Sequence, residues 1–216
     1  YSWPDGALYT GEFQNGIKQG KGVYTFADGT RYIGELKENQ PDGRGNFSFK
    51  NGKEYTGDVR KGVMHGNGTL TFADKRKFTG SFKDGKIDGD GVLIWPDGKK
   101  YTGQFSESLP DGAGTLAWPD GKIYTGEFNN GVVEGRGQLS WPSGKKIFGN
   151  FKKGLINGQG EMNHDDGRKY IGNFQNGKKH GKGTFSWPDG RLYMGEFVKD
   201  IFQGEGTYIW SNKDRY

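Results

Sequence analysis

Apolar and polar residues alternate in two short runs along the chain, and both runs return every 23 residues. In the unit that opens at Tyr124, the first run reads YTGEF and the second reads GRGQLSW. Apolar side chains at every second position indicate a β-strand with one dry face. Numbering the unit in columns from its opening residue, we expect strands over columns one to six and twelve to eighteen. A glycine-containing turn joins them, so each unit predicts a β-hairpin.

The repeat covers almost the whole chain. Nine units follow one another without insertion or deletion, and half a unit precedes them. A fixed period in the twenties is typical of a repeat architecture. We therefore expect one array without an internal boundary: a half repeat over residues 1–8, nine repeats over 9–215 and the start of a tenth at 216. The repeats open at Tyr9, Tyr32, Tyr55, Phe78, Tyr101, Tyr124, Ile147, Tyr170 and Tyr193.

Glycine occupies fixed columns inside the expected strands. Columns three, twelve and fourteen are glycine in all nine repeats, and together with columns eight and 21 and Gly6 they hold all 41 glycines. A four-residue loop at columns seven to ten would set column five opposite twelve, three opposite fourteen and one opposite sixteen. A five-residue loop at columns nineteen to 23 would set the next column one beside column eighteen. Most large rings would then face a glycine, which leaves room for them on the neighbouring backbone.

The pattern of residues resembles a known family. Tyr-x-Gly-x-Phe, a glycine seven columns later, then Gly-x-Gly and an aromatic strand are similar to MORN repeats (membrane occupation and recognition nexus). The resemblance covers all nine repeats. It implies an all-β fold, an elongated, twisted single-layer antiparallel sheet of tandem 23-residue hairpins that serves as a scaffold or partner-binding module. It also implies a cytoplasmic protein associated with the cytoskeleton or with cilia.

Composition limits the class of protein. The chain is 31% hydrophobic, which alone could indicate disorder, but 15% aromatic residues at a strict period contradict that interpretation. There is no cysteine, no signal-peptide pattern and no apolar run long enough to span a membrane. The first methionine is Met64 and the ends fall inside the pattern, so we expect a fragment of a longer protein.

Candidate chemistry is sparse. The Gly-x-Gly pairs lie inside strands and precede no helix, which disfavours a nucleotide-binding loop. His65, His164 and His180 lie in different repeats without a shared carboxylate motif, so we expect no metal site and no cofactor. No nucleophile–base arrangement stands out, and we predict no catalytic residues and no enzymatic activity. The net charge of +5 does not favour nucleic-acid binding.

The aromatic columns predict a binding surface. Columns one and eighteen would place tyrosines and tryptophans in a row, a larger apolar patch than monomers usually expose unless twist folds the face inward or a partner covers it. We expect this row to bind a helical or extended protein segment, best between Trp95 and Trp141, with Ile147 and His164 marking one end. The predicted partner-binding residues are Trp95, Tyr101, Trp118, Tyr124, Trp141, Tyr170, Trp187 and Tyr193.

A second hypothesis is a peripheral membrane module. Column 22 is basic in seven repeats and could meet anionic phospholipid, although the aspartates of column twenty run parallel and partly neutralise it. The terminal strands also offer free edges, so homo-oligomers are possible. The predicted lipid-binding residues are Lys53, Arg76, Lys99, Lys122, Lys145, Arg168 and Arg191.

Overall fold

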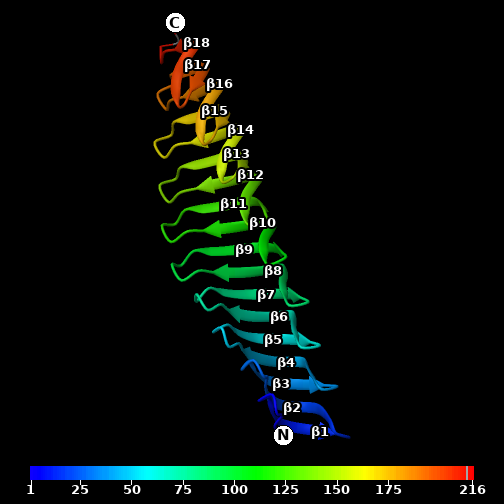
Figure 1. Cartoon of the computed structure of the whole chain (residues 1–216). Helices are drawn as coiled ribbons and strands as arrows, with labels where there is room; N and C mark the ends of the chain where they lie inside the picture. Colours follow the sequence, from blue (N-terminus) through cyan, green and yellow to red (C-terminus); the bar gives the residue numbers. More distant parts are fainter. Residues whose placement is uncertain (213) are drawn as a thin grey trace. The chain divides into compact units, whose positions relative to one another are not determined.

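The computed structural model describes residues 1–212 and 214–216. Within them every regular element is a β-strand, and consecutive strands form antiparallel hairpins (Figure 1). The predicted all-β fold of tandem hairpins is therefore confirmed. Contacts divide the chain into two compact units, unit 1 (Tyr1–Leu109) and unit 2 (Pro110–Tyr216). Each is described by itself, and the single array over 1–216 stays a prediction.

Strands follow the chain order in each unit. A first strand of seven residues alternates with a second of nine. Unit 1 holds β1 (Leu8–Gln14), β2 (Ile17–Thr25), β3 (Arg31–Lys37), β4 (Gln40–Ser48), β5 (Glu54–Arg60), β6 (Val63–Thr71), β7 (Lys77–Lys83), β8 (Lys86–Ile94) and β9 (Lys100–Ser106). Strand β10 (Leu109–Ala117) starts at the boundary, and unit 2 continues with β11 (Ile123–Asn129), β12 (Val132–Ser140), β13 (Lys146–Lys152), β14 (Leu155–Asn163), β15 (Lys169–Gln175), β16 (Lys178–Ser186), β17 (Leu192–Val198) and β18 (Ile201–Ile209).

The hairpin tips are tighter than the predicted four-residue loop. Two residues at columns seven and eight connect the strands, and both are left-handed, as at Asn130 (φ 47°) and Gly131 (φ 81°). This is the turn that matches the twist of a hairpin best. The second strand therefore begins at column nine, not twelve. Where column eight is not glycine, as at Ser108 (φ 70°), the side-chain hydroxyl accepts a hydrogen bond from the Ile87 N–H of the preceding repeat (3.1 Å).

Register within a hairpin is partly as predicted. Column one faces sixteen and column three faces fourteen, as Gly126 faces Gly137. Column five faces column ten instead of twelve, as Phe128 faces Val133. The difference arises because the column-twelve glycine (Gly135, φ 85°) is left-handed and forms a bulge between the two pairings.

Register between repeats also differs from the prediction. Column one of a repeat faces column sixteen of the preceding one, as Tyr124 faces Leu116, so the tyrosine does not pair with the tryptophan. The tryptophan opens the connecting loop, which spans columns eighteen to 22. The Trp118 N–H donates to the Lys122 carbonyl (2.9 Å) and the Gly121 N–H donates to the Trp118 carbonyl (2.9 Å). Column eighteen is therefore a loop position.

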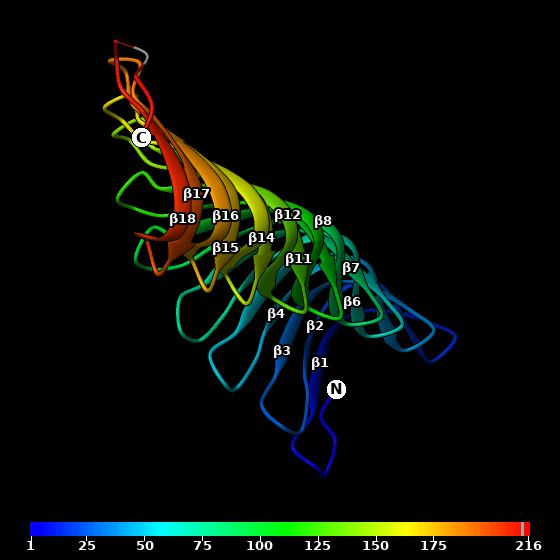
Figure 2. The same cartoon turned by 90° about the horizontal axis from the view of Figure 1, so that it is seen from above.

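The strands bend strongly toward their aromatic face. Lys18 and Tyr24 lie six residues apart on β2, which in a straight strand separates their Cα atoms by about 20 Å. The Lys18 Nζ nevertheless lies 3.8 Å from the centroid of the Tyr24 ring. Figure 2 shows the strands as arcs. The bend therefore lies between Lys18 and Tyr24, a segment that contains the column-twelve and column-fourteen glycines, Gly20 and Gly22.

This bend buries the aromatic rings without a second layer of structure. The Tyr124 ring packs edge-on against Phe128 of its own repeat (5.3 Å between centroids) and Phe151 of the next (5.1 Å). Column ten, which has no obvious pattern in the sequence, completes this core through residues such as Ile87 and Ile156. The face that would have been a large exposed patch is folded inward.

Candidate partner-binding surface

Between the nine repeats, the loops that begin at Trp95, Trp118 and Trp187 are built by the sequence around a Pro-Asp-Gly turn, and the other loops are variants of it. Proline presets the first turn dihedral and glycine takes the left-handed one, as at Gly121 (φ 82°). The column-twenty aspartate then accepts the N–H of column 22, as Asp120 does from Lys122 (3.0 Å). Successive loops of unit 2 touch, because a Cβ added to Gly121 would lie 2.6 Å from Cγ of Pro142. The loops therefore present their column-eighteen and column-22 side chains side by side.

The aromatic and basic residues predicted for two different functions form one surface. In unit 2 the Lys122 Nζ lies 4.2 Å from the centroid of the Trp118 ring, and the Lys145 Nζ lies 4.9 Å from that of Trp141. A cation over an indole face is attracted by the ring quadrupole. All of these side chains are half-buried. We call this surface the loop strip; it consists of Trp118, Lys122, Trp141, Lys145, His164, Arg168, Trp187 and Arg191.

Charge on the loop strip is unevenly compensated. The Arg168 Nε lies 2.7 Å from Asp166 and the Arg191 Nε lies 2.8 Å from Asp189. Within the described part of the chain, no carboxylate oxygen lies within 4.0 Å of the amino group of Lys122 or Lys145. The charge of each arginine is thus balanced by an aspartate of the same loop, whereas the two lysines lie over indole rings without a paired carboxylate.

The predicted tyrosines belong to the core. Tyr101 and Tyr170 are 0% exposed, Tyr124 is 1% and Tyr193 is 8% exposed. Their hydroxyls donate to the column-four carbonyl of the same repeat, as Tyr170 does to Asn173 (2.8 Å). Burial raises the pKa of Tyr124 and of Tyr170 to about 12. In this conformation these rings cannot contact a partner. Of the predicted partner-binding residues, only the tryptophans are accessible.

Unit 1 carries a weaker version of the same arrangement. The Lys99 Nζ lies 4.3 Å from the Trp95 ring, and the Arg76 guanidinium lies 4.7 Å from the Phe72 ring. Lys53 approaches the Phe72 ring from the preceding repeat (6.0 Å). The earlier repeats hold phenylalanine in column eighteen, which lacks the indole surface and its N–H. Of the predicted tryptophans, Trp95 lies in unit 1, and Trp118, Trp141 and Trp187 lie in unit 2.

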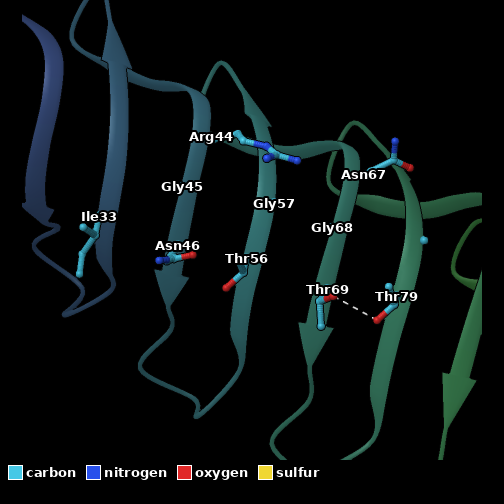
Figure 3. A pocket seen from close by; sticks show the side chains of 11 residues that line it. Ile33, Arg44, Gly45, Asn46, Thr56, Gly57, Asn67, Gly68, Thr69 and Thr79 are labelled. Carbon is cyan, nitrogen blue, oxygen red and sulfur yellow. Dashed lines mark hydrogen bonds between the residues drawn. The ribbon is translucent and has the colours of Figure 1, made fainter.

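Sequence reasoning missed a furrow on the opposite face of the sheet. In unit 1 a hollow of about 580 Å³ is floored by the backbone of glycines such as Gly57 and Gly68 and walled by Thr69 and Thr79, whose hydroxyls are 3.0 Å apart (Figure 3). Similar hollows occur in unit 2, walled partly by Ile171. The glycine columns could have indicated this furrow, because a glycine leaves the backbone bare on both faces.

Comparison with known families assigns the repeats. A family description named MORN repeat matches nine segments of this chain. They are residues 9–31, 32–54, 55–75, 78–100, 101–123, 124–146, 148–167, 170–190 and 193–215.

This chain belongs to the MORN-repeat family. A comparison with curated proteins gave no match. Among solved structures, the wild-type TCP10 domain of Danio rerio CPAP has a TM-score of 0.52 at 17% identity, covering 89% of this chain and 91% of that chain. A point mutant of that domain has a TM-score of 0.50 at 16% identity, covering 90% and 96%. The same domain in complex with a peptide of Danio rerio STIL aligns with a TM-score of 0.42 at 18% identity, covering 98% and 87%. At these identities the similarity to the wild-type and mutant domains shows the fold of the sheet alone.

The described residues contain no cluster of three or more histidine, cysteine, aspartate or glutamate side chains that could hold a metal ion. They also include no helix long and apolar enough to cross a membrane.

The seventh MORN repeat interrupts the loop strip with a histidine. The His164 ring lies 6.1 Å from the Phe185 ring, and its buried Nε2 finds no hydrogen-bond partner among the residues that the structure describes. Burial lowers the pKa of His164, and the positive charges of Lys179, Arg168 and Lys145 lower it further, against an opposite effect of Asp166. His164 is therefore neutral near pH 7.

This histidine makes the MORN array sensitive to acid. The folded protein takes up the His164 proton at a lower pH than the unfolded chain, in which histidine titrates near pH ~6.5. The contribution of neutral His164 to the free energy of unfolding is therefore fully present above about pH 6.5. It is lost as the pH falls from there through the folded-state pKa. Urea unfolding at about pH 7.5 and 5.5 should show a smaller acid-induced loss in His164→Gln than in wild type. An equal loss of unfolding free energy in both proteins would contradict the lowered pKa of His164.

Proposed function

We propose that this chain is a non-catalytic scaffold that binds a segment of a protein partner along the loop strip of unit 2. The observation that carries the proposal is the repetition of a half-buried indole with a cation over its face, at Trp118, Trp141 and Trp187. Tryptophan and arginine are the residues that dominate binding hot spots. Half-buried rings are already ordered by the protein, so little side-chain entropy is lost when a partner covers their exposed part.

The spacing of the loop strip fits a linear partner. One loop follows every second strand, which places the column-eighteen side chains of successive repeats about 10 Å apart. An extended or helical segment can therefore contact one repeat after another. Membership of the MORN-repeat family supports a scaffold role. We propose that the protein acts in a cytoskeletal or ciliary assembly in the cytoplasm.

The test is a binding comparison between folded variants. Partners captured from ciliated or cytoskeletal extract are identified, and their affinity for the purified chain is measured by calorimetry. Trp118→Ala and Trp141→Ala should each weaken binding by about 2 kcal/mol or more, the usual hot-spot threshold. A matched control is Leu155→Ala, which changes an exposed apolar residue outside the strip and should have little effect. Unchanged affinity in both tryptophan variants would refute the proposal.

A membrane-surface role is the second candidate, favoured by the occurrence of tryptophan and lysine on one strip. Tryptophan is enriched at membrane interfaces, and each lysine near an anionic leaflet contributes about 1 kcal/mol. The aspartates paired with Arg168 and Arg191 weigh against it. Co-sedimentation with vesicles containing phosphatidylserine decides: binding that is lost in Lys122→Ala and Lys145→Ala would replace the protein-scaffold function.

Oligomerisation through the terminal strands stays a prediction. The chain ends occupy part of each edge, because the Tyr9 N–H donates to Tyr1 (2.8 Å) and Tyr208 and Tyr216 exchange two hydrogen bonds (2.9 Å each).

A further inference from the structure

Three departures from the repeat pattern meet at one place in unit 2. Column twenty holds Ser143, where the neighbouring repeats hold aspartate. Column eighteen holds His164, where they hold tryptophan, and column ten holds Lys179, where most repeats hold an apolar residue. Each departure either adds a basic group or removes the acid that would balance one.

Lys179 lies where the fold provides an apolar environment. Its Nζ lies 4.9 Å from the Phe185 ring centroid and 5.8 Å from that of Tyr170, and burial lowers its pKa. The matching lysine of the first repeat, Lys18, lies between two aromatic faces, 3.8 Å from Tyr24 and 4.7 Å from a tryptophan. At Lys179 the position of that tryptophan is taken by a histidine. Lys179 therefore lacks the indole ring that lies over Lys18.

Lys145 lacks the carboxylate that the column-twenty aspartate provides in the neighbouring repeats. Its backbone N–H bonds only the Ser143 hydroxyl (3.4 Å), whereas Arg168 in the next repeat is held by Asp166 through both its N–H and its guanidinium. Among the described residues, no carboxylate lies within 4.0 Å of Nζ of Lys145 or of Lys179. The charges of both lysines remain available to a ligand.

His164 lies among these cations. It and Lys179 contact the same Phe185 ring, at 6.1 Å and 4.9 Å. Lys145, Arg168 and Lys179 all act electrostatically on His164. Two carboxylates face the cluster: Asp166 pairs with Arg168, and Asp200 accepts the backbone N–H of Lys179 (3.0 Å) and offsets part of the charge of that lysine. An incoming anion would offset the repulsion among the basic groups that Asp166 and Asp200 compensate only in part.

We propose that Lys145 and Lys179, which both act on His164, bind an acidic stretch of the partner segment, rich in aspartate or glutamate. This inference rests on the proposed function and adds the charge of the partner and the repeat boundary that it occupies. Charge complementarity favours an acidic chain, because uncompensated positive charge gathers at one boundary between repeats beside the exposed part of Trp141. Clustered basic residues can also meet anionic lipid head groups, so binding to a membrane is the alternative outcome of the test.

The test uses a capped hexaglutamate peptide as probe. Its affinity for the full chain is measured by calorimetry at low and physiological salt. Ser143→Asp restores the aspartate of the other repeats, and Lys179→Ile copies Ile156, so both variants suit the fold. Each should weaken binding about fivefold, the effect of one exposed ion pair. Lys178→Ala removes the neighbouring exposed lysine and should change affinity less than twofold.

A second readout separates binding from a structural effect. The pKa of His164, followed by NMR, should rise when the peptide is bound, because the peptide's negative charge stabilises the imidazolium. An unchanged pKa, or an equal loss of affinity in Lys178→Ala, would overturn the proposal. Binding to phosphatidylserine vesicles without binding to the peptide would also overturn it, in favour of the membrane.

The identified partner distinguishes this inference from the proposed function. If Trp118→Ala weakens partner binding and Ser143→Asp does not, the acidic-segment inference fails and the scaffold function stands. If neither variant changes partner binding, both fail. Weakening by both variants supports both.

Discussion

Replacing Gly137 by valine is expected to destabilise unit 2 by about 1–3 kcal/mol, the usual cost of overpacking a core. A Cβ at this position would lie 2.6 Å from two carbons of the Tyr124 ring. At Gly126 it would lie 2.5 Å from the Arg136 carbonyl oxygen and 2.6 Å from the Cα of Gly137. Backbone atoms yield less readily than a side chain, so Gly126→Val should cost at least as much.

Matched controls come from the opposite face of the same strands. Thr125 faces Gln138 directly beside the glycine pair, with both side chains away from the rings. Thr125→Val and Gln138→Val should therefore change stability by no more than about 0.5 kcal/mol. The midpoint of urea unfolding measures all four variants. Equal tolerance at glycine and control positions would show that the rings do not depend on the bare backbone.

The second large effect is expected at a buried column-one ring. Tyr170→Ala should lower the free energy of unfolding by about 3–5 kcal/mol, as for other large aromatic truncations. Tyr170 is 0% exposed and packs against Phe174 (5.0 Å) in its own repeat and Phe197 (4.9 Å) in the next. The substitution would leave a cavity that links two repeats.

The control for Tyr170 is already present in the chain. Phe78 holds the same column in the fourth repeat, is 0% exposed and packs against Phe82 (5.2 Å) and Phe105 (5.0 Å). Tyr170→Phe should therefore lose only the hydroxyl bond to the Asn173 carbonyl, about 1 kcal/mol. Thermal unfolding followed by near-ultraviolet circular dichroism separates the two variants. If Tyr170→Ala cost no more than Tyr170→Phe, the ring would not belong to the core.

Sequence alone was a good guide to the hairpins and a poor guide to which rings are accessible. Alternation shows which side chains share a face, and it correctly joined Tyr124 with Phe128 on one side of the strand. It cannot show whether that face is open, because the bend brings together residues such as Lys18 and Tyr24 that are far apart along a straight strand. The tyrosines were therefore predicted as surface and are core.

The candidate site divides in the same way. The sequence shows both the tryptophans and the basic column as repeating residues. They were assigned to protein binding and to lipid binding respectively, because a period does not give the distance between two columns. The loop between columns eighteen and 22 folds Lys122 back over Trp118 and makes one surface of the two. The charge left free at Lys179 depends on a neighbour from another repeat, His164.

What the sequence determined by itself is local and periodic: the nine 23-residue units, the hairpin in each, and the glycine and aromatic columns. These follow from steric and solvation preferences that act within a few residues. Only the tertiary structure decided the two-residue tips, the bulge at Gly135, the inward bend and the burial of the tyrosines. Those features depend on left-handed glycine and on rings that pack between repeats, so they result from contacts across strands that no single unit specifies.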